Sequence, residues 1–271
     1  MPLQLRGSPG VLSRRFLRKT GGEFVRPIAF ITLIVAAEFA AAAGLGSAAA
    51  PVDVPDTMAE RVKPCIACHG PEDRTGRDGY YPRIASKPEG YLFNQLRNFR
   101  DGRRYYRPMA LLLADVSDQY LLEMAAYFST LKQPYPPPEH MSASPGEIKL
   151  AQQLINRGDP SRKIPACVQC HGKELMGTAP FIPGLLGLPR AYLVAQFGAW
   201  RTGGLMRGQA PDCMSEIAKQ LTPNETNAIA AWLAAQPVPE DAAPVSALSA
   251  EMARRCGSIV QRGGAHPESG G

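Results

Sequence analysis

The pattern Cys-x-x-Cys-His occurs twice in this chain of 271 residues, at 65–69 and again at 167–171. It is the attachment signature of c-type haem. Two thiols at this spacing can add to the two vinyl groups of one porphyrin, and the next residue offers an imidazole to the iron. A lone Cys-x-x-Cys could be a redox dithiol or half of a zinc site, but the adjoining histidine and the repetition argue against both. The sequence therefore predicts two covalently bound haem c groups, attached through Cys65, Cys68, Cys167 and Cys170, with His69 and His171 as iron ligands.

The first 48 residues have the order of a secretory signal peptide. A basic region around Arg14 and Arg15 precedes an apolar run at 27–37, and small residues follow as far as Ala48. The twin arginines suggest twin-arginine export, although an ordinary positive region explains them more simply. An uncleaved anchor is the rival, but Glu38 interrupts a run that is short for a spanning helix. We expect cleavage near Ala48 and a periplasmic protein, since covalent haem attachment is done outside the cytoplasm.

Part of the net positive charge of the chain lies in this predicted signal peptide. Removing residues 1–48 takes away six basic and two acidic residues, so the formal net charge falls from +6 to +2. No stripe of basic and aromatic side chains appears, which argues against nucleic-acid binding. The 26 prolines and 26 glycines favour loop-rich domains in which a large prosthetic group supplies core volume.

An internal repeat follows the leader. The segment 91–96, Tyr-Leu-Phe-Asn-Gln-Leu, is echoed by 192–197, Tyr-Leu-Val-Ala-Gln-Phe, at nearly the spacing that separates the two histidines. A Pro-rich stretch lies between the two copies and is expected to be a stiff connector. The predicted organisation is a signal peptide at 1–48, a first haem-binding domain at 52–133, a linker at 134–145, a second haem-binding domain at 146–237 and a flexible tail at 238–271.

Each copy reads as helical, so the predicted fold class is all-α. Ser144 and Thr222 each open a capping box with proline at the first helical position. The helix expected from Ser117 carries one apolar face, made of Leu121, Met124, Ala125 and Phe128. The middle helices are expected to begin near Pro88 and Pro189. No convincing strand alternation appears anywhere.

Methionine is the expected second ligand of each iron, because a thioether favours ferrous iron and raises the reduction potential. Met109 lies eight residues before Ser117, and Met214 lies eight residues before Thr222. No other pair of methionines holds that register, so Met109 and Met214 are the predicted ligands.

Three other methionines are alternatives to this pair as iron ligands. Met124 lies on an apolar helix stripe and is expected in the core. Met176 is too close to His171 to reach the opposite face of a haem. Met206 has no counterpart in the first copy, yet it is the serious competitor in the second.

The two copies resemble class I cytochrome c domains, and their tandem order is similar to the di-haem cytochrome c4 family. The resemblance covers roughly residues 55–237. It implies a helical fold around two partly exposed haems and a periplasmic electron-carrying role without substrate chemistry. The partners would be an electron donor and acceptor of a respiratory chain. The matching features are the two Cys-x-x-Cys-His-Gly runs, Pro82, Pro183, the Tyr-Leu-x-x-Gln segments, Met109, Met214 and the final aromatic helices.

Two other functions stay open at this point. The same motifs would serve a haem subunit of a larger membrane-associated dehydrogenase or oxidase complex. A di-haem peroxidase is a weaker alternative, because no His or Glu is placed as a distal acid-base group. The paired Met register favours two closed irons and hence no enzyme.

Several features have no assigned role. Five arginines before Met109 could bind haem propionates, dock an acidic partner or form an ordinary solvated face. Cys213 and Cys256 could form a disulfide between domain 2 and the tail, although free thiols or an intermolecular bond are alternatives. His140 and His266 are expected to be solvated. The arginines are Arg97, Arg100, Arg103, Arg104 and Arg107.

Overall fold

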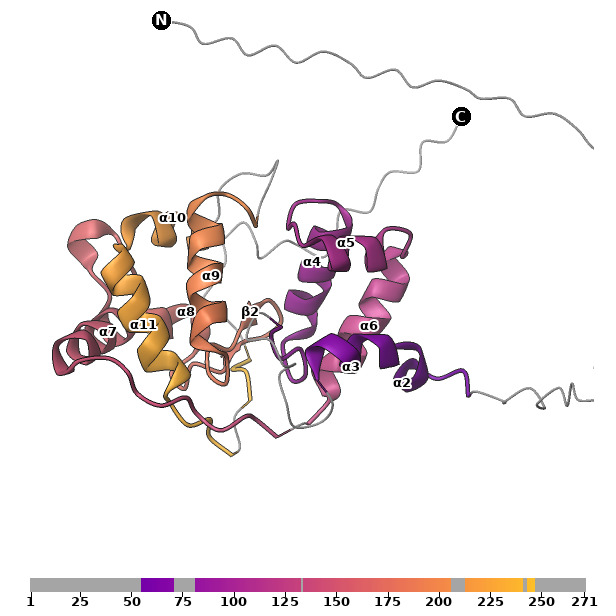
Figure 1. Cartoon of the computed structure of the whole chain (residues 1–271), viewed down its shortest axis with the longest axis horizontal. Coiled ribbons are helices and arrows are strands. Elements are labelled where there is room, and N and C mark those ends of the chain that lie inside the picture. The colour runs from indigo at the N-terminus through magenta and orange to yellow at the C-terminus, as the bar shows by residue number, and fades with distance from the viewer. Residues whose placement is uncertain (1–54, 71–80, 133, 206–212, 241–242, 247–271) are drawn as a thin grey trace, which may run out of the picture. The chain divides into compact units, whose positions relative to one another are not determined.

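The computed structural model describes residues 55–70, 81–132, 134–205, 213–240 and 243–246. The chain divides into two units, Met1–Asp53 and Val54–Gly271, and every described residue belongs to the second unit. The predicted signal peptide, Met206, Cys256, His266 and most of the predicted tail lie outside the described residues. The described part is mostly helical, which confirms the predicted all-α class (Figure 1).

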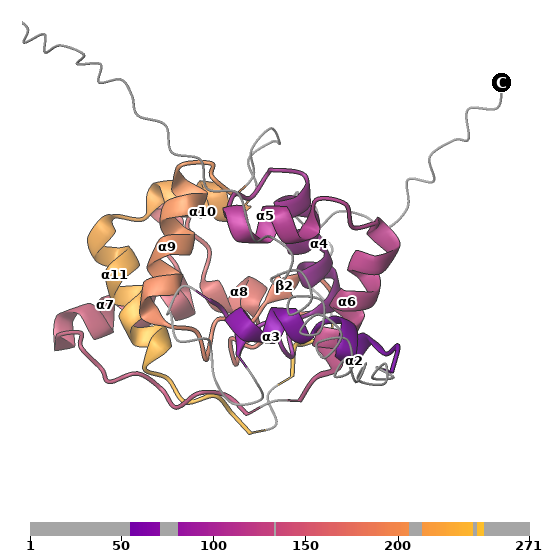
Figure 2. The ribbon, with the colours of Figure 1, turned by 45° about the vertical axis from the view of Figure 1, so that its right-hand side comes forward.

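The helices of the first copy pack around α4 and α6 (Figure 2). α4 also contacts α5, and α2 contacts both α3 and α6. The buried side chains at this packing are mostly those of the predicted apolar faces, including Leu121, Ala125 and Phe128. The elements are α2 (Met58–Arg61), α3 (Lys63–His69), α4 (Glu89–Arg100), α5 (Arg107–Leu113) and α6 (Asp118–Thr130).

The second copy repeats this order: α7, like α2, precedes the Cys-x-x-Cys-His helix and packs against the last helix of its copy. α11 packs against α7 and α9, and α10 packs against α9. Ala151, Leu154, Ile155, Ile229 and Leu233 are buried in its core. The elements are α7 (Pro145–Arg157), the 3₁₀ turn η2 (Pro160–Arg162), α8 (Cys167–His171), β1 (Gly177–Thr178), β2 (Ile182–Pro183), α9 (Arg190–Arg201), α10 (Cys213–Gln220) and α11 (Pro223–Ala234).

The helix starts follow the predicted caps. The hydroxyl oxygen of Ser117 accepts a hydrogen bond from the backbone N–H of Tyr120 at 3.2 Å. Ser144 and Thr222 form the two predicted capping boxes. Pro88 and Pro189 occupy the N-cap positions of α4 and α9, where a missing N–H costs nothing. Local sequence therefore determines where these helices begin.

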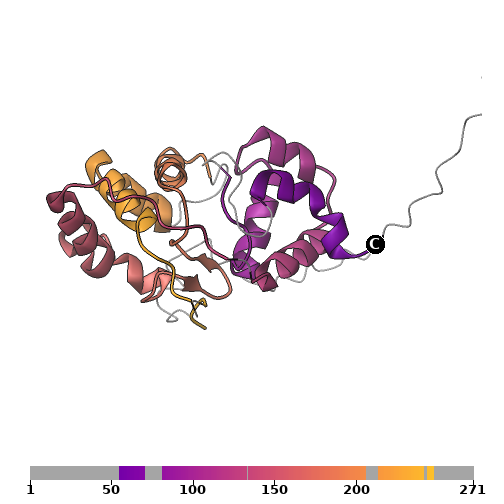
Figure 3. The same cartoon turned by 60° about the horizontal axis from the view of Figure 1, so that its bottom comes forward.

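The expectation of no strands was wrong at one place. β1 and β2 form a two-residue antiparallel ladder, visible as the pair of short arrows in Figure 3. Strands this short contain no alternation that a sequence pattern could reveal. Thr178 also donates a hydrogen bond to the backbone oxygen of Cys170 at 2.7 Å. The ladder thus ties the loop after α8 to the Cys-x-x-Cys-His helix.

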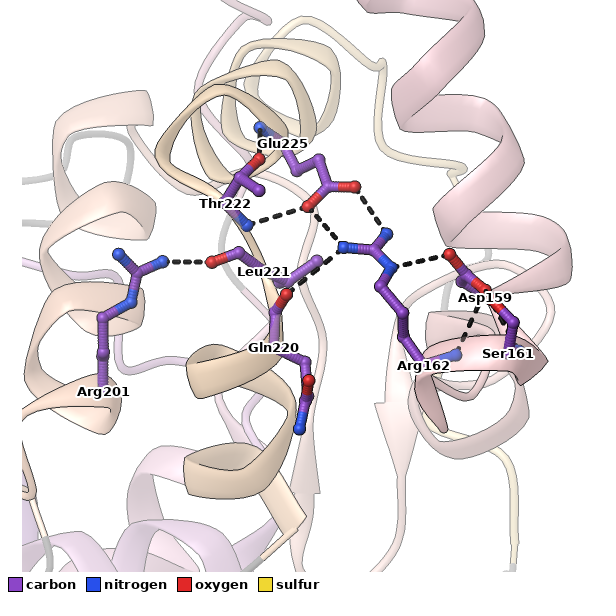
Figure 4. A network of polar contacts seen from close by, with 8 residues as sticks. All are labelled: Asp159, Ser161, Arg162, Arg201, Gln220, Leu221, Thr222 and Glu225. Atoms are coloured by element: carbon purple, nitrogen blue, oxygen red, sulfur yellow. Dashed lines mark hydrogen bonds and ion pairs between the residues drawn. The ribbon is translucent and has the colours of Figure 1, made fainter.

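Arg162 joins α11 to the turn before α8 through a polar network (Figure 4). Its guanidinium donates to Glu225 Oε1 at 2.6 Å and to Asp159 Oδ2 at 2.7 Å. Glu225 Oε2 also accepts from the backbone N–H of Thr222 at 2.8 Å, which completes the capping box. The Glu225 side chain is only 10% exposed. Its largely buried carboxylate therefore takes part in both the ion pair and the helix cap.

We predict that Glu225→Gln lowers the free energy of unfolding by about 2 kcal/mol at neutral pH, because a charge-assisted contact is lost. The hydrogen bond from Arg162 holds the pKa of Glu225 below its usual value of 4.5. The stabilisation is therefore complete above the unfolded pKa and is lost as the pH falls through the folded pKa. Urea unfolding of the haem-loaded protein at neutral pH and at a pH below 4 measures both effects.

Glu216→Gln on the exposed face of α10 is the matched control, and it should leave stability unchanged. A difference between wild type and Glu225→Gln that stays constant into strong acid would contradict this account of Glu225.

Candidate functional site

Each Cys-x-x-Cys-His run forms a short helix that ends at its histidine. α3 ends at His69 and α8 at His171, and the next residue in each case is a glycine. Gly70 has φ 83° and Gly172 has φ 80°, a conformation that other residues adopt only with strain. Cysteines three positions apart lie on the same side of a helical turn. The sequence thus presents two thiols together and turns the chain away directly after the imidazole.

A proline carbonyl orients each histidine. Nδ1 of His69 lies 2.9 Å from the backbone oxygen of Pro82, and Nδ1 of His171 lies 2.7 Å from that of Pro183. A carbonyl oxygen can only accept a hydrogen bond, so Nδ1 carries the proton in both rings. The lone pair is then on Nε2, which is the arrangement of a metal-binding histidine fixed by an outer hydrogen bond.

Burial keeps both imidazoles neutral. It lowers the pKa of His69 and of His171, against the opposing effect of their proline carbonyls. Burial also raises the pKa of Cys65, and raises that of Cys167 to about 12. Neither cysteine pair is joined in a disulfide. The four cysteines are therefore free thiols, as covalent attachment of haem requires, and each histidine can offer a lone pair to iron.

One cavity of about 880 Å³ is lined by all of the predicted site residues. Met109 is on α5 and Met214 is on α10, the helices that precede the last helix of each copy. The rest of the lining is largely apolar, as a haem pocket must be to exclude water. The eight predicted residues at this cavity are Cys65, Cys68, His69, Met109, Cys167, Cys170, His171 and Met214.

Of the competing methionine and histidine residues, Met124 also lines the cavity, whereas Met176 and His140 do not. Met124 is 7% exposed in the first core, as predicted. Met176 is 5% exposed in the second core, away from the cavity lining. His140 is exposed and does not line the cavity. Met206 and His266 lie outside the described residues. The repeat register, rather than the cavity lining, therefore favours Met109 over Met124 as a ligand.

Three of the five arginines before Met109 lie close to two acidic side chains of the first copy. Asp101 pairs with Arg100 and with Arg103, each at 2.8 Å. Asp118 pairs with Arg100 at 2.6 Å, and it lies 3.8 Å from Arg97. These contacts hold the loop between α4 and α5, but two carboxylates leave the five arginines with a net positive charge.

Arg104 lines the cavity together with Arg97 and Arg103, and it differs from them because its side chain hydrogen-bonds to the second copy. Its guanidinium donates to Gln95 at 2.7 Å, to Gln196 at 3.1 Å and to the hydroxyl of Tyr192 at 3.3 Å. Gln95 and Gln196 are equivalent residues of the two repeats. One arginine therefore hydrogen-bonds to both copies of the Tyr-Leu-x-x-Gln motif.

Cys213, at the start of α10, is disulfide-bonded. Its predicted partner, Cys256, lies outside the described residues. The disulfide constrains the helix that carries Met214.

Sequence reasoning missed the buried cations. Lys87 and Arg83 are 5% and 6% exposed, and both line the cavity. The repeat register contained the signal for one of them, because it aligns Lys87 with the apolar Leu188. A charged residue in place of a leucine at a repeat position marks a difference in environment between the two copies.

Known proteins match this chain over most of the described region. It is 39% identical over 177 residues to the thiosulfate dehydrogenase electron acceptor of Thiomonas intermedia, covering 64% of this chain and 79% of that protein. It is 30% identical over 171 residues to cytochrome c4 of Pseudomonas aeruginosa, covering 62% of this chain and 82% of that protein. No family model matches. The chain belongs to the cytochrome c4 family.

The structural comparison agrees with this membership. Reduced cytochrome c4 of Pseudomonas stutzeri superposes with a TM-score of 0.56 at 27% identity, over 66% of this chain and 96% of that chain. The predicted tandem class I cytochrome c fold and the predicted pair of covalent haem c groups are thereby confirmed. This cytochrome is a di-haem electron-transfer protein. Among its described helices, none is both long and apolar enough to cross a bilayer.

Proposed function

We propose that this cytochrome accepts electrons from a thiosulfate dehydrogenase and passes them to a respiratory acceptor. The observation that supports electron transfer most directly is the single cavity lined by all eight predicted site residues. The donor is suggested by the relative from Thiomonas intermedia, which is named an electron acceptor of thiosulfate dehydrogenase.

The proposed roles of the residues follow from their geometry. Each cysteine pair attaches one haem, and His69 and His171 bind iron through Nε2 while a proline carbonyl holds Nδ1. Met109 and Met214 are the second iron ligands. Bound haem supplies a one-electron ferric–ferrous couple. The protein keeps water out and holds both ligands in place in each oxidation state, so little geometry changes when an electron arrives.

The same roles imply that this cytochrome is not itself an enzyme, because both irons are closed by protein ligands. A second candidate function is the haem subunit of a larger membrane-associated dehydrogenase or oxidase complex. The acceptor name of the Thiomonas intermedia relative favours this candidate too, since an acceptor can be bound permanently to its dehydrogenase. We further propose export to the periplasm on residues 1–48 and domain boundaries as the sequence predicts.

We predict that Met109→Ala and Met214→Ala each remove half of the near-infrared band that arises from charge transfer between methionine and ferric iron. Each variant should also lower one of the two reduction potentials, because loss of the thioether favours ferric iron. Met124→Leu is the matched control: it changes a buried methionine at nearly constant volume and should leave the band intact. A full band in either alanine variant would overturn that ligand assignment.

The donor proposal is tested by mixing the ferric cytochrome with thiosulfate in the presence and absence of a purified thiosulfate dehydrogenase. We expect rapid reduction of both haems with the enzyme present and no turnover with thiosulfate alone. Failure of reduction by the enzyme would contradict the donor assignment. Sustained oxidation of thiosulfate by the cytochrome alone would instead support an enzyme. Stable co-elution with the dehydrogenase during gel filtration would favour the subunit role.

A further inference from the structure

Lys87 is a buried lysine of the first repeat, and its side chain contacts the second repeat. It is the last residue before Pro88, the N-cap of α4, and it is 5% exposed. Its Nζ donates a hydrogen bond to the backbone oxygen of Gly184 at 3.0 Å. Among the described residues no acidic side chain forms an ion pair with it. Its position is therefore set by a carbonyl of the other repeat.

That carbonyl belongs to the segment that supports the second histidine. Gly184 directly follows Pro183, whose own carbonyl accepts the hydrogen bond from Nδ1 of His171. Lys87 and His171 also line the same cavity. The ammonium group of Lys87 thus lies next to the outer support of the proposed iron ligand in the second repeat.

Among the described residues that line the cavity, every lysine and arginine belongs to the first repeat, so the second repeat supplies no equivalent cation there. The register that pairs the two Tyr-Leu-x-x-Gln segments also pairs Lys87 with Leu188, and each precedes the proline that opens the next helix. Leu188 is 8% exposed and packs in the core of its own repeat. The loop before α4 also contains Arg83. Its guanidinium donates to the Pro134 backbone oxygen and lies over the Tyr135 ring. Lys87 is therefore a cation that the first repeat supplies to the second, without a counterpart at the equivalent position, Leu188.

Burial makes the charged form of Lys87 unfavourable, and it also strengthens the effect of that charge on its surroundings. Burial, together with the nearby Arg83, lowers the pKa of Lys87 to about 7. A medium that solvates the ammonium poorly also screens its field poorly. Reduction of a nearby iron would add one negative charge, which the ammonium group attracts. The cation therefore favours the reduced haem, and reduction in turn favours the protonated lysine.

We propose that Lys87 is a positioning residue that the first repeat supplies to the second, where it raises the reduction potential of the haem attached at Cys167 and Cys170. The inference rests on the proposed binding of that haem through His171. It makes the second haem the preferred resting place of a single electron, relative to the same protein without this cation.

The test compares Lys87→Gln with Lys87→Arg in the haem-loaded cytochrome at pH 6, below the pKa of Lys87. Haem methyl resonances, assigned to each repeat by their contacts to protein protons, are followed through a redox titration. We expect Lys87→Gln to lower the equilibrium constant for reduction of the second haem about tenfold, or ~59 mV for a one-electron couple. The first haem should change less, and Lys87→Arg should retain the wild-type potential.

Two further variants separate this effect from loss of folding or of surface charge. Lys87→Leu installs the residue of the other repeat and preserves apolar packing if Lys87→Gln is unstable. Lys219→Gln removes one exposed cation from α10 and should leave both potentials unchanged. Equal shifts of both haems, no shift in either, or the same fall in Lys87→Arg as in Lys87→Gln would overturn the proposal. Absence of methyl contacts between a haem and the second repeat would instead contradict the proposed haem placement.

Discussion

The hydrogen bond from each histidine to a proline carbonyl is the contact on which the site depends. It links a helix of five or seven residues, too short to be stable alone, to the loop that precedes the middle helix of its repeat. It also selects the tautomer, because the carbonyl can only accept. Without it, the imidazole of His69 or His171 would have no fixed direction relative to the cavity. The glycines at positive φ turn the chain directly after each histidine, and in the second repeat Pro183 is itself part of the β1–β2 ladder.

The two repeats share this contact but differ in what surrounds it. His171 is 7% exposed, whereas His69 is less completely buried. The N-terminal helix of the second repeat, α7, has 13 residues, whereas α2 has 4, and the second repeat also contains the Arg162–Glu225 network. The first repeat supplies the cavity-lining cations, and two of them, Lys87 and Arg104, hydrogen-bond to the second. Duplication of one unit followed by such local changes gives two redox centres that need not have equal potentials.

Much of the fold and the site could be predicted from the sequence because their signals are local. The Cys-x-x-Cys-His runs, the capping residues Ser144 and Thr222, and the apolar face of α6 each depend on neighbours within a few positions. The repeat added one long-range inference, the pairing of Met109 with Met214, and both line the cavity. The contact of Lys87 with Gly184 could not be predicted in this way, since it joins residues far apart in the sequence through one backbone oxygen. The β1–β2 ladder was missed because two residues form no pattern.

We propose that two haems per chain are each bound by one histidine and one methionine in this cavity. The most direct measurement is the near-infrared and electron paramagnetic resonance spectrum of the purified ferric protein, quantified against its haem content. The account predicts two low-spin, methionine-ligated haems per chain. A high-spin iron, or an iron bound by two histidines, at either site would contradict it.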